Sequence, residues 1–339
     1  MRIKPIKDGK QEQVEQARNF ANKIWNASRF VLISLGEGFV PRAEIPAPQT
    51  LTDRWILSRL SVTAETVNAA FDSYNLDDAA RALYEFFWDD FCDWYVEAAK
   101  PRLQAEASAD AVRQLLYHVL EQTLRLLHPI MPYLTEAIWQ TLRSPSSANV
   151  ATLPGAKTLT GKAFLMFAPF PTASVAPRDE TAEGDLAILQ ETIRAIRNLR
   201  SENNVKGAGG EAFVSPGDDE VRALLADADN AALVRFLARV ETVTIGDGDA
   251  NGYLAATKYG TVRIPRPEAT PEELAQERLR LEKELAKIEK DRPGLSARLE
   301  NPDFLARSPA PVIEKAQAQA ADLDERKAKL SERLAQLAA

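Results

Sequence analysis

Residues 14–32 read VEQARNFANKIWNASRFVL, and this stretch decides the fold that the sequence predicts. Small and apolar residues recur every three or four positions, which is typical of an α-helix with one buried side. The predicted buried stripe contains Val14, Ala17, Ala21, Ile24, Ser28 and Val31, with Trp25 and Leu32 beside it. The sequence therefore predicts an amphipathic helix as the first element of a helical protein.

The opposite side of this helix is polar in an unusual way. Asparagine costs about 0.7 kcal/mol relative to alanine in a helix interior, so folding alone does not favour a cluster of asparagines. Amide and guanidinium groups are planar and forked, and they suit the edges of nucleobases and phosphates. An ordinary solvated face is the alternative interpretation, and this helix alone leaves both open. The candidate recognition residues are Arg18, Asn22, Asn26 and Arg29.

The loop that follows supplies one more candidate. Two glycines and three prolines in residues 34–53 predict an irregular connection. Phe39 lies in this loop, close to Arg42, where an exposed ring would stack on a base. The alternative interpretation is that the loop folds back and the Phe39 ring packs into the helical bundle as a hydrophobic plug.

Further amphipathic patterns predict helices over 53–74, 76–100 and 110–128, and a short one over 135–142. Thr52 or Asp53 is expected to cap the second helix. Lys100 and Arg102 end the third helix, where the helix dipole favours cations and where a phosphate would also fit. Short connections between the helices predict a bundle over residues 1–143.

Three regions of different character follow the bundle. Residues 144–180 are rich in Ser, Pro, Ala and Gly and predict a linker or strap, with a strand-like stretch at 163–170. Residues 181–267 predict a small α+β unit that opens with a helix. Leucines at heptad spacing predict an antiparallel coiled-coil hairpin over 268–339, with Pro293 and Gly294 bending or breaking its first arm. In the opening helix of the α+β unit, Arg194, Arg197 and Arg200 are expected to form a ridge, either solvated or following a phosphate backbone.

Composition limits the class of protein. The 339 residues are 45% hydrophobic, carry a net charge of −7 and include one cysteine, Cys92. A bulk electrostatic binder of nucleic acid would be basic, and a lone cysteine suits a reducing compartment. The sequence contains no evident signal peptide or membrane segment, so we expect a cytoplasmic protein. It also lacks an evident glycine-rich phosphate loop, metal-ligand spacing or catalytic triad, so we expect no catalytic or metal-binding residues. The length and helical patterns predict a mainly α protein of two or three domains.

Several long motifs occur in an order that resembles the last part of bacterial valyl-tRNA synthetases. The motifs of their anticodon-binding bundle are ARNFANKIWNASRF (17–30), TDRWILSRL (52–60), FCDWYVEAAKPRL (91–103) and LLHPIMPYLTEAIW (126–139). The stretch ENPDFLARSPAPVIEK (300–315) resembles the turn region of their C-terminal coiled-coil arm. The HIGH and KMSKS signatures for ATP binding occur nowhere in the sequence.

The resemblance implies a tRNA-binding function. It implies that the bundle holds the anticodon stem-loop of valine tRNA and that the arm braces the corner of the tRNA. Because the two arms of a hairpin pair with each other, we expect a monomer. ATP with Mg²⁺ would be required only by the full-length enzyme, whose catalytic domain is either attached upstream or absent. Two other hypotheses stay open: a protein-interaction scaffold, and a fragment that is active only with a separate catalytic half.

Overall fold

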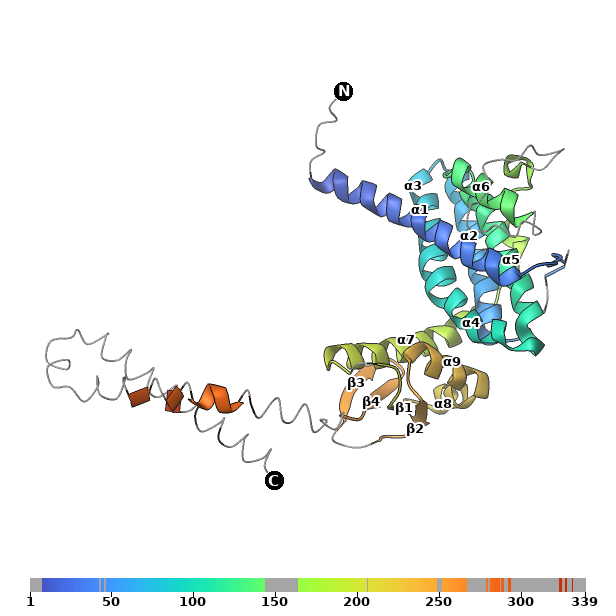
Figure 1. Ribbon diagram of the computed structural model, residues 1–339. Coiled ribbons are helices and arrows are strands. Elements are labelled where there is room, and N and C mark those ends of the chain that lie inside the picture. Colours follow the sequence, from blue (N-terminus) through green and yellow to red (C-terminus); the bar gives the residue numbers. More distant parts are fainter. Residues whose placement is uncertain are drawn as a thin grey trace. The chain divides into compact units, whose positions relative to one another are not determined.

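The helices predicted in the first 143 residues pack side by side in a computed structural model of the chain (Figure 1). Two compact units are present, Met1–Pro265 and Arg266–Ala339. The structure describes residues 8–42, 44–45, 47–143, 164–205, 207–248 and 252–266, and in the second unit 279, 281–286, 288–289, 292–293, 323–324, 327 and 331.

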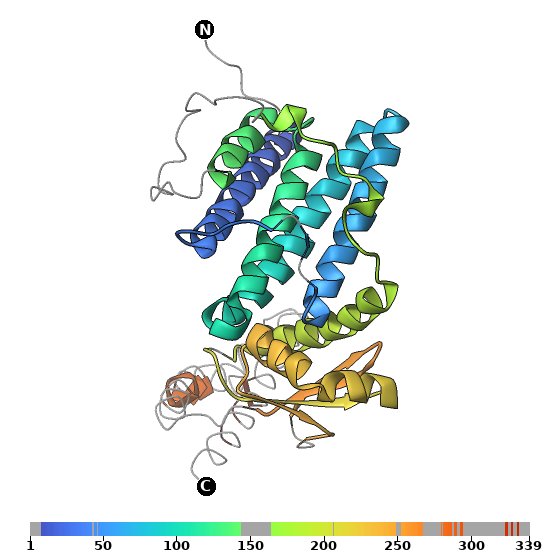
Figure 2. The ribbon, with the colours of Figure 1, turned by 90° about the vertical axis from the view of Figure 1, so that its right-hand side faces the viewer.

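The bundle consists of six α-helices and one π-helix among the described residues. The elements are α1 (Asp8–Leu35), α2 (Leu51–Asp72), α3 (Leu76–Glu85), the π-helix η1 (Phe86–Val96), α4 (Glu97–Gln104), α5 (Glu106–Leu127) and α6 (Pro132–Leu142). Short turns join α2 to α3, α4 to α5 and α5 to α6, whereas α3, η1 and α4 follow one another without a break (Figure 2).

The first helix joins the core only through its second half. Ile24, Val31 and Leu35 are buried, as the helical period predicts. The prediction that Val14 begins the buried stripe was wrong, because Val14 is 60% exposed and Ala17 is exposed as well. The first turns of α1 therefore extend past the neighbouring helices.

The cap of α2 differs by two residues from the prediction. Thr50, not Thr52, is the N-cap residue, and its hydroxyl accepts a hydrogen bond from the Asp53 amide. The Asp53 carboxylate in turn accepts from the Thr50 amide at 3.2 Å, which completes a capping box. Asp53 is thus the third helical residue, and its carboxylate supports the cap from inside the helix.

The aromatic segment of residues 86–95 lies at the centre of the bundle. Phe86, Phe87, Phe91 and Tyr95 of η1 are almost fully buried, and Cys92 lies among them. The sequence pattern predicted one continuous α-helix over 76–100, whereas residues 86–96 form an 11-residue π-helix between α3 and α4. A π-helix has more residues per turn than an α-helix, so it changes which side chains of residues 86–96 point outward.

Residues 164–179 run back along the bundle as a strap. The strand predicted within 163–170 does not form there; Leu165–Phe167 is a 3₁₀ turn (η2), and a second one (η3) covers Ala173–Val175. No strand lies beside the strap among the described residues, so its backbone bonds to side chains of the helices instead. Two such bonds are from Asn68 to the Pro171 carbonyl at 2.8 Å and from Ser61 to the Ala173 carbonyl at 2.6 Å.

The strap leads into α7 (Glu180–Glu202), which packs on α2 and opens the α+β unit. The other elements are β1 (Glu211–Pro216), α8 (Asp219–Ala226), α9 (Ala228–Ala238), β2 (Thr242–Ile245), β3 (Tyr253–Thr257) and β4 (Gly260–Ile264). Their strand order is β2-β1-β4-β3, with β1 and β2 parallel and the other pairs antiparallel. Residues 1–265 form one unit, and the boundary predicted at residue 180 stays a prediction.

The described residues of the second unit pair as an antiparallel hairpin. Arg292 forms an ion pair with Asp324 at 2.7 Å, and Lys327 forms one with Glu289 at 3.0 Å. Going from Glu289 to Arg292 along one arm, the partner moves back from Lys327 to Asp324 along the other, as antiparallel helices require. Pro293 is helical, while Gly294 lies outside the described residues. Among the helices that the structure describes, none is both long and apolar enough to cross a membrane.

Candidate nucleic-acid interface

The polar face of α1 is exposed where the sequence predicts it. All four candidate residues, Arg18, Asn22, Asn26 and Arg29, have exposed side chains. Ile24, Ser28 and Val31 on the other side of the helix are buried. In the described parts of the chain, no carboxylate forms an ion pair with Arg18 or Arg29. These two guanidinium groups can therefore meet an external anion.

Phe39 is a correction to the predicted site. Its side chain is only 8% exposed, and its ring lies 5.6 Å from the ring of Tyr117. The loop folds back on α5, where the Gln114 side-chain amide donates to the Val40 carbonyl at 2.9 Å and accepts from the Arg42 amide at 2.9 Å. Phe39 is thus the hydrophobic plug of the bundle, and its ring is not available for stacking on a base.

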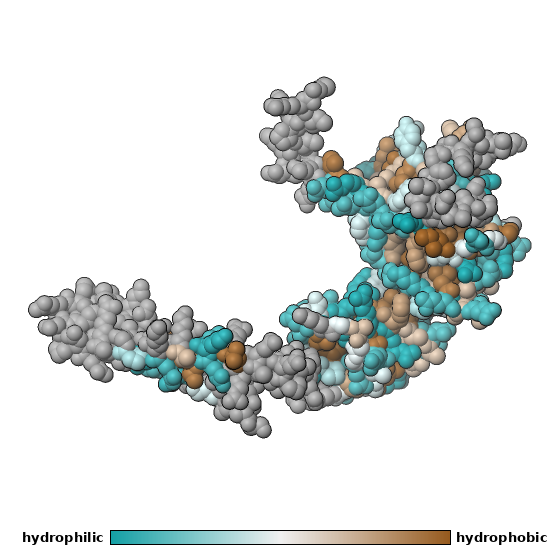
Figure 3. All heavy atoms as spheres, viewed as in Figure 1, coloured by the Kyte–Doolittle hydropathy of each residue, from teal (hydrophilic) through white to brown (hydrophobic). Residues whose placement is uncertain are grey.

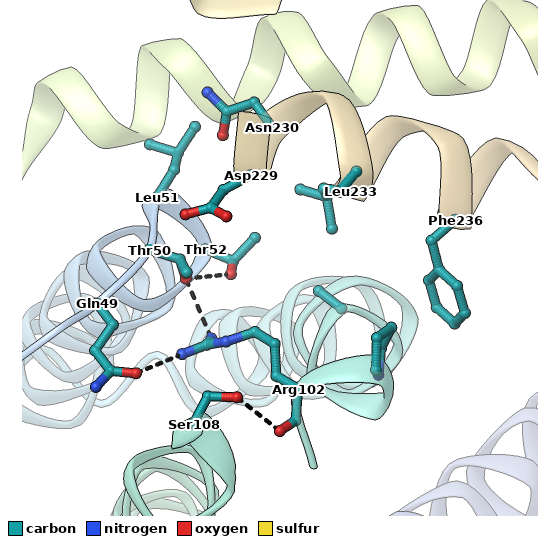
Figure 4. Close-up of a pocket in the computed structure, with 13 residues that line it drawn as sticks. Gln49, Thr50, Leu51, Thr52, Arg102, Ser108, Asp229, Asn230, Leu233 and Phe236 are labelled. Carbon is teal, nitrogen blue, oxygen red and sulfur yellow. Dashed lines mark hydrogen bonds between the residues drawn. The ribbon is translucent and has the colours of Figure 1, made fainter. Parts of the chain in front are cut away.

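Arg102 is a second correction. Its guanidinium donates to both carboxylate oxygens of Asp53, at 2.7 and 2.9 Å, and also to Thr50 at 3.1 Å. Asp53 is fully buried and accepts a further bond from the Tyr95 hydroxyl at 3.0 Å. Removing one partner of such a buried pair is expensive, so Arg102 is held for folding. Figure 4 shows Arg102 at the wall of a cavity of about 370 Å³ between α2, α4 and α9.

Lys100 is also occupied, though less tightly. Its ammonium group lies 2.5 Å from the Glu97 carboxylate, one helical turn back, and 5.8 Å from the centre of the Phe30 ring. The side chain is 39% exposed. Lys100 therefore ties α4 to α1 and retains only part of its surface for a ligand.

Arg194 and Arg197 of α7 lie against the same tryptophan. Their guanidinium carbons lie 5.2 and 5.8 Å from the centre of the Trp94 ring in η1. Trp94 is buried beneath them, while both arginines keep exposed surface. Cation–π contact holds the two guanidinium groups in fixed positions, which lowers the entropy cost when they bind an anion. The sequence analysis singled out Arg194 and Arg197, but no local pattern predicted that both guanidinium groups would contact Trp94.

Arg239, which the sequence analysis did not single out, adds to this positive charge. It ends α9 in the left-handed conformation, at φ 58°, and its side chain is exposed. Burial lowers the pKa of Arg197, and the charges of Arg239 and Arg194 lower it further. The Arg197 Nε also donates to the Leu237 carbonyl at 2.8 Å. An anion bound among the three guanidinium groups would relieve their mutual repulsion.

Arg200 does not continue the ridge. Its guanidinium donates to the carbonyls of Gly207 and Gly209, both at 2.7 Å, and the side chain is 8% exposed. The prediction of three arginines along an outer ridge was therefore wrong for this residue. Because α7 ends over the loop before β1, Arg200 in its last turn faces that loop rather than solvent.

A second aromatic contact lies on the side of η1 that faces α1. The Lys23 ammonium lies 4.9 Å from the centre of the Trp88 ring, and Trp88 stacks on Tyr84 at 5.4 Å. Lys23 also forms an ion pair with Asp93 at 2.6 Å. Each of the helices α1 and α7 thus places at least one cation on an indole of η1.

The carboxylates of η1 lie between these cations. Burial raises the pKa of Asp89, and the charges of Asp93 and Glu85 raise it further. Asp90 pairs with Arg59 at 2.8 Å. The Asp90 carboxylate therefore joins η1 to α2 through an ion pair.

Figure 1 shows α1 and α7 projecting from the same side of the bundle, with the segment from α3 to α4 between them. The surface between the two helices is largely hydrophilic in the same view (Figure 3). The bundle therefore has a concave side with one cationic helix on each flank and two indole rings of η1 at its base.

Comparison with known proteins agrees with this arrangement. Residues 53–212 match the anticodon-binding domain of tRNA ligases, and residues 273–338 match the valyl-tRNA synthetase tRNA binding arm. A valine–tRNA ligase of Carboxydothermus hydrogenoformans is 41% identical over 308 residues, or 90% of this chain and 33% of that protein. The valine–tRNA ligase of Thermosynechococcus vestitus is 42% identical over 91% of this chain and 32% of that protein. That of Gloeobacter violaceus is 39% identical over 98% of this chain and 36% of that protein.

The chain belongs to the valine–tRNA ligase family. It spans about a third of the length of the curated relatives that it matches, and it corresponds to their C-terminal part. The range of the anticodon-binding family contains η1 and α7 with Trp94, Arg194 and Arg197, whereas α1 precedes that range. Within the described residues, no group of three His, Cys, Asp or Glu side chains is placed to hold a metal ion.

Proposed function

We propose that this chain is the tRNA-binding portion of a valine–tRNA ligase and that its concave side holds the anticodon stem-loop. The observation that carries the proposal is the pair of cationic flanks, with Arg18 and Arg29 on α1 and Arg194 and Arg197 on α7, on either side of η1. Asn22 and Asn26 add amides that can read base edges. Arg239 extends the α7 flank.

The net charge of −7 restricts how the chain binds RNA. A protein with this charge repels RNA over most of its surface, so binding depends on the few places where cations gather. The α7 cluster is the best such place, because two of its guanidinium groups are already oriented by Trp94. The coiled-coil arm would brace the corner of the tRNA.

In the full-length enzyme, the proposed reaction is the attachment of valine to tRNA(Val) with ATP and Mg²⁺, in the cytoplasm. The segment described here would contribute RNA binding and no reacting group. We propose that it acts as a monomer. If sedimentation shows a stable dimer that does not bind RNA, the scaffold hypothesis is favoured instead.

Fluorescence anisotropy with labelled tRNA(Val) tests the proposal. We expect the affinity to fall steeply with salt. Arg194→Ala or Arg197→Ala should weaken binding. The salt slope, which is the slope of log affinity against log salt concentration, should become shallower by about one unit for each phosphate that the arginine no longer neutralises. Arg29→Ala on the opposite flank should act in the same direction. The matched control is Arg222→Ala, since Arg222 is exposed on α8, away from η1.

Specificity needs a separate comparison. A tRNA(Val) transcript with an altered anticodon should bind more weakly than the natural one, by about 1–3 kcal/mol for each base that is read. Equal affinity for every tRNA and every anticodon would remove the anticodon from the proposal. Unchanged binding in the Arg194, Arg197 and Arg29 variants would show that RNA lies elsewhere.

A further inference from the structure

A cavity of about 370 Å³ lies where α9 packs against the helical bundle (Figure 4). The start of α2, the end of α4 and the start of α5 form one wall, and α9 forms the other. Most of the lining surface is apolar and comes from Leu51, Ala98, Pro101, Leu233 and Phe236. None of the residues proposed to bind RNA lines this cavity, and its volume is in the range of small-molecule sites.

Both walls of the cavity are fixed by contacts behind them. On the bundle side, the Arg102 guanidinium donates to the buried Asp53 carboxylate at 2.7 and 2.9 Å. On the other side, Asn230 of α9 donates to a carbonyl of α8 at 3.0 Å, and the Leu237 carbonyl of α9 accepts from Arg197 at 2.8 Å. The space is therefore preformed, and a ligand that enters it does not have to order the walls.

Two charged side chains, Arg102 and Asp229, line the cavity. Among the described residues, Arg102 forms its ion pair with Asp53, and the Asp229 carboxylate forms none. Burial lowers the pKa of Arg102, but the hydrogen bond with Asp53 and the charges of Asp53 and Asp229 raise it overall. One guanidinium group thus faces two carboxylates, so the cavity carries a negative charge that no cation compensates.

This combination of charge and apolar surface selects one class of ligand. Figure 4 shows Asp229, Leu233 and Phe236 of α9 on the side of the cavity that faces Arg102. An ammonium group beside the exposed Asp229 would keep contact with water, while an apolar body would fill the space next to Leu233. Phe236 is 45% exposed and adds an aromatic face, which attracts a cation. An anion would instead be repelled by Asp229, and it would find both terminal nitrogens of Arg102 already donating to Asp53 and other acceptors.

We propose that the cavity between α2, α4 and α9 binds a small organic ammonium ion with an apolar body. Asp229 is the partner of the ammonium group, and the apolar lining around Leu233 holds the body. The proposal goes beyond RNA binding by this chain and does not depend on it.

Isothermal titration calorimetry with the full chain of 339 residues tests the proposal. The probe is the 2-phenylethylammonium ion, which carries one ammonium group on a compact apolar body. At neutral pH we expect saturable binding with a Kd of about 1 mM or tighter. The alcohol 2-phenylethanol has the same body without the charge and should bind at least about threefold more weakly. Phenylacetate, which carries the opposite charge, should not bind.

Two variants test the two parts of the site. Asp229→Asn removes the charge and should weaken binding of the probe about fivefold, as expected for one partly exposed ion pair. The matched control is Asp219→Asn, since Asp219 is exposed in the first turn of α8 and does not line the cavity. Ala232→Trp introduces an indole from an exposed position of α9 that lines the cavity, and it should weaken binding at least about tenfold.

Each outcome decides the proposal. Binding that both Asp229→Asn and Ala232→Trp weaken, and that Asp219→Asn leaves unchanged, supports it. No saturable binding up to about 10 mM, equal affinity for 2-phenylethanol, or unchanged affinity in Asp229→Asn overturns it. Weaker binding in Asp229→Asn alone also overturns it, because the probe would then lie on the surface and not in the cavity. Thermal unfolding checks that the variants fold; for an unfolded Ala232→Trp, the Leu233 methyl resonances of the unsubstituted chain replace it, and they must shift when the probe is added.

Discussion

At the scale of single residues, the fold controls the charge of His118 in the acid range. It lies on α5, and its Nε2 is buried without a hydrogen-bond partner among the described residues. Burial lowers the pKa of His118 to about 4, while a hydrogen bond with the backbone of Val175 in the strap opposes this effect. The histidine is therefore neutral in the folded protein at neutral pH.

The stability of the fold should consequently fall below pH 6.5. An unfolded histidine takes up a proton near pH 6.5, whereas His118 in the fold does so only near pH 4, so acid favours the unfolded chain between these values. We expect the free energy of unfolding to drop by about 1.5 kcal/mol between pH 6.5 and 5. Urea denaturation at a series of pH values measures this slope.

The control for His118 is the variant His118→Gln, which cannot titrate. Its free energy of unfolding should be nearly flat between pH 6.5 and 5, whatever its absolute value. If the wild-type and variant slopes are the same, the acid sensitivity belongs to other groups, and His118 is not the sensor.

Single residues were also where prediction from sequence failed most clearly. Phe39 and Arg102 are the residue types that bind RNA, and their neighbours in sequence suggested exposure. Each instead has a partner far away in the sequence, Tyr117 for one and Asp53 for the other. Local patterns hold no information on such partners, because tertiary packing alone brings them together.

At the scale of elements, the turn between β3 and β4 is the most constrained. Gly260 has φ 144°, and a Cβ atom there would overlap the Ser215 carbonyl oxygen of β1 and lie 3.0 Å from the Gly217 nitrogen. Both neighbours are backbone and cannot move aside without breaking the pairing of β1 with β4. We expect Gly260→Ala to lower the free energy of unfolding by about 3 kcal/mol.

Gly184 in α7 is the matched control for this substitution. No atom lies within 4 Å of a Cβ built there, and the residue is in the helix interior. Gly184→Ala should stabilise the protein by about 0.5–1 kcal/mol. Thermal unfolding of both variants compares them directly, and a Gly260→Ala protein as stable as the wild type would show that the turn can relax.

Elements with a clear period were predictable, and those shaped by their neighbours were not. The α+β unit predicted over 181–267 opens with a helix, as expected, and contains four strands, at 211–216, 242–245, 253–257 and 260–264. The π-helix and the 3₁₀ turns of the strap were missed. The dense aromatics of η1 pack equally well in an α- or a π-helical pattern, and the strap has no partner strand among the described residues to pair with Leu165–Phe167.

At the scale of the whole molecule, the order of the parts was clear from the sequence because each part carries its own apolar pattern. The bundle and the α+β unit each have a buried apolar core, although Val14 and Ala17 lie outside it, and the described residues of the hairpin are helical. The packing of α7 on α2 was not foreseeable, since it depends on contacts such as the ion pair of Arg54 with Asp179 at 3.1 Å. That packing is what places Arg194 and Arg197 on Trp94 and so creates the candidate interface.

Removing the second unit separates folding from RNA binding. Because Met1–Pro265 and Arg266–Ala339 are distinct compact units, a chain that ends at Pro265 should keep the free energy of unfolding of the first unit within about 0.5 kcal/mol. Its affinity for tRNA(Val) should fall at least about tenfold, because the arm would no longer act as a second, linked binding site. The salt slope should become shallower by about one unit for each phosphate that the arm neutralises in the full chain. An affinity and a salt slope equal to those of the full chain would show that the arm takes no part in holding RNA, and the concave side of the bundle would then account for all of the binding.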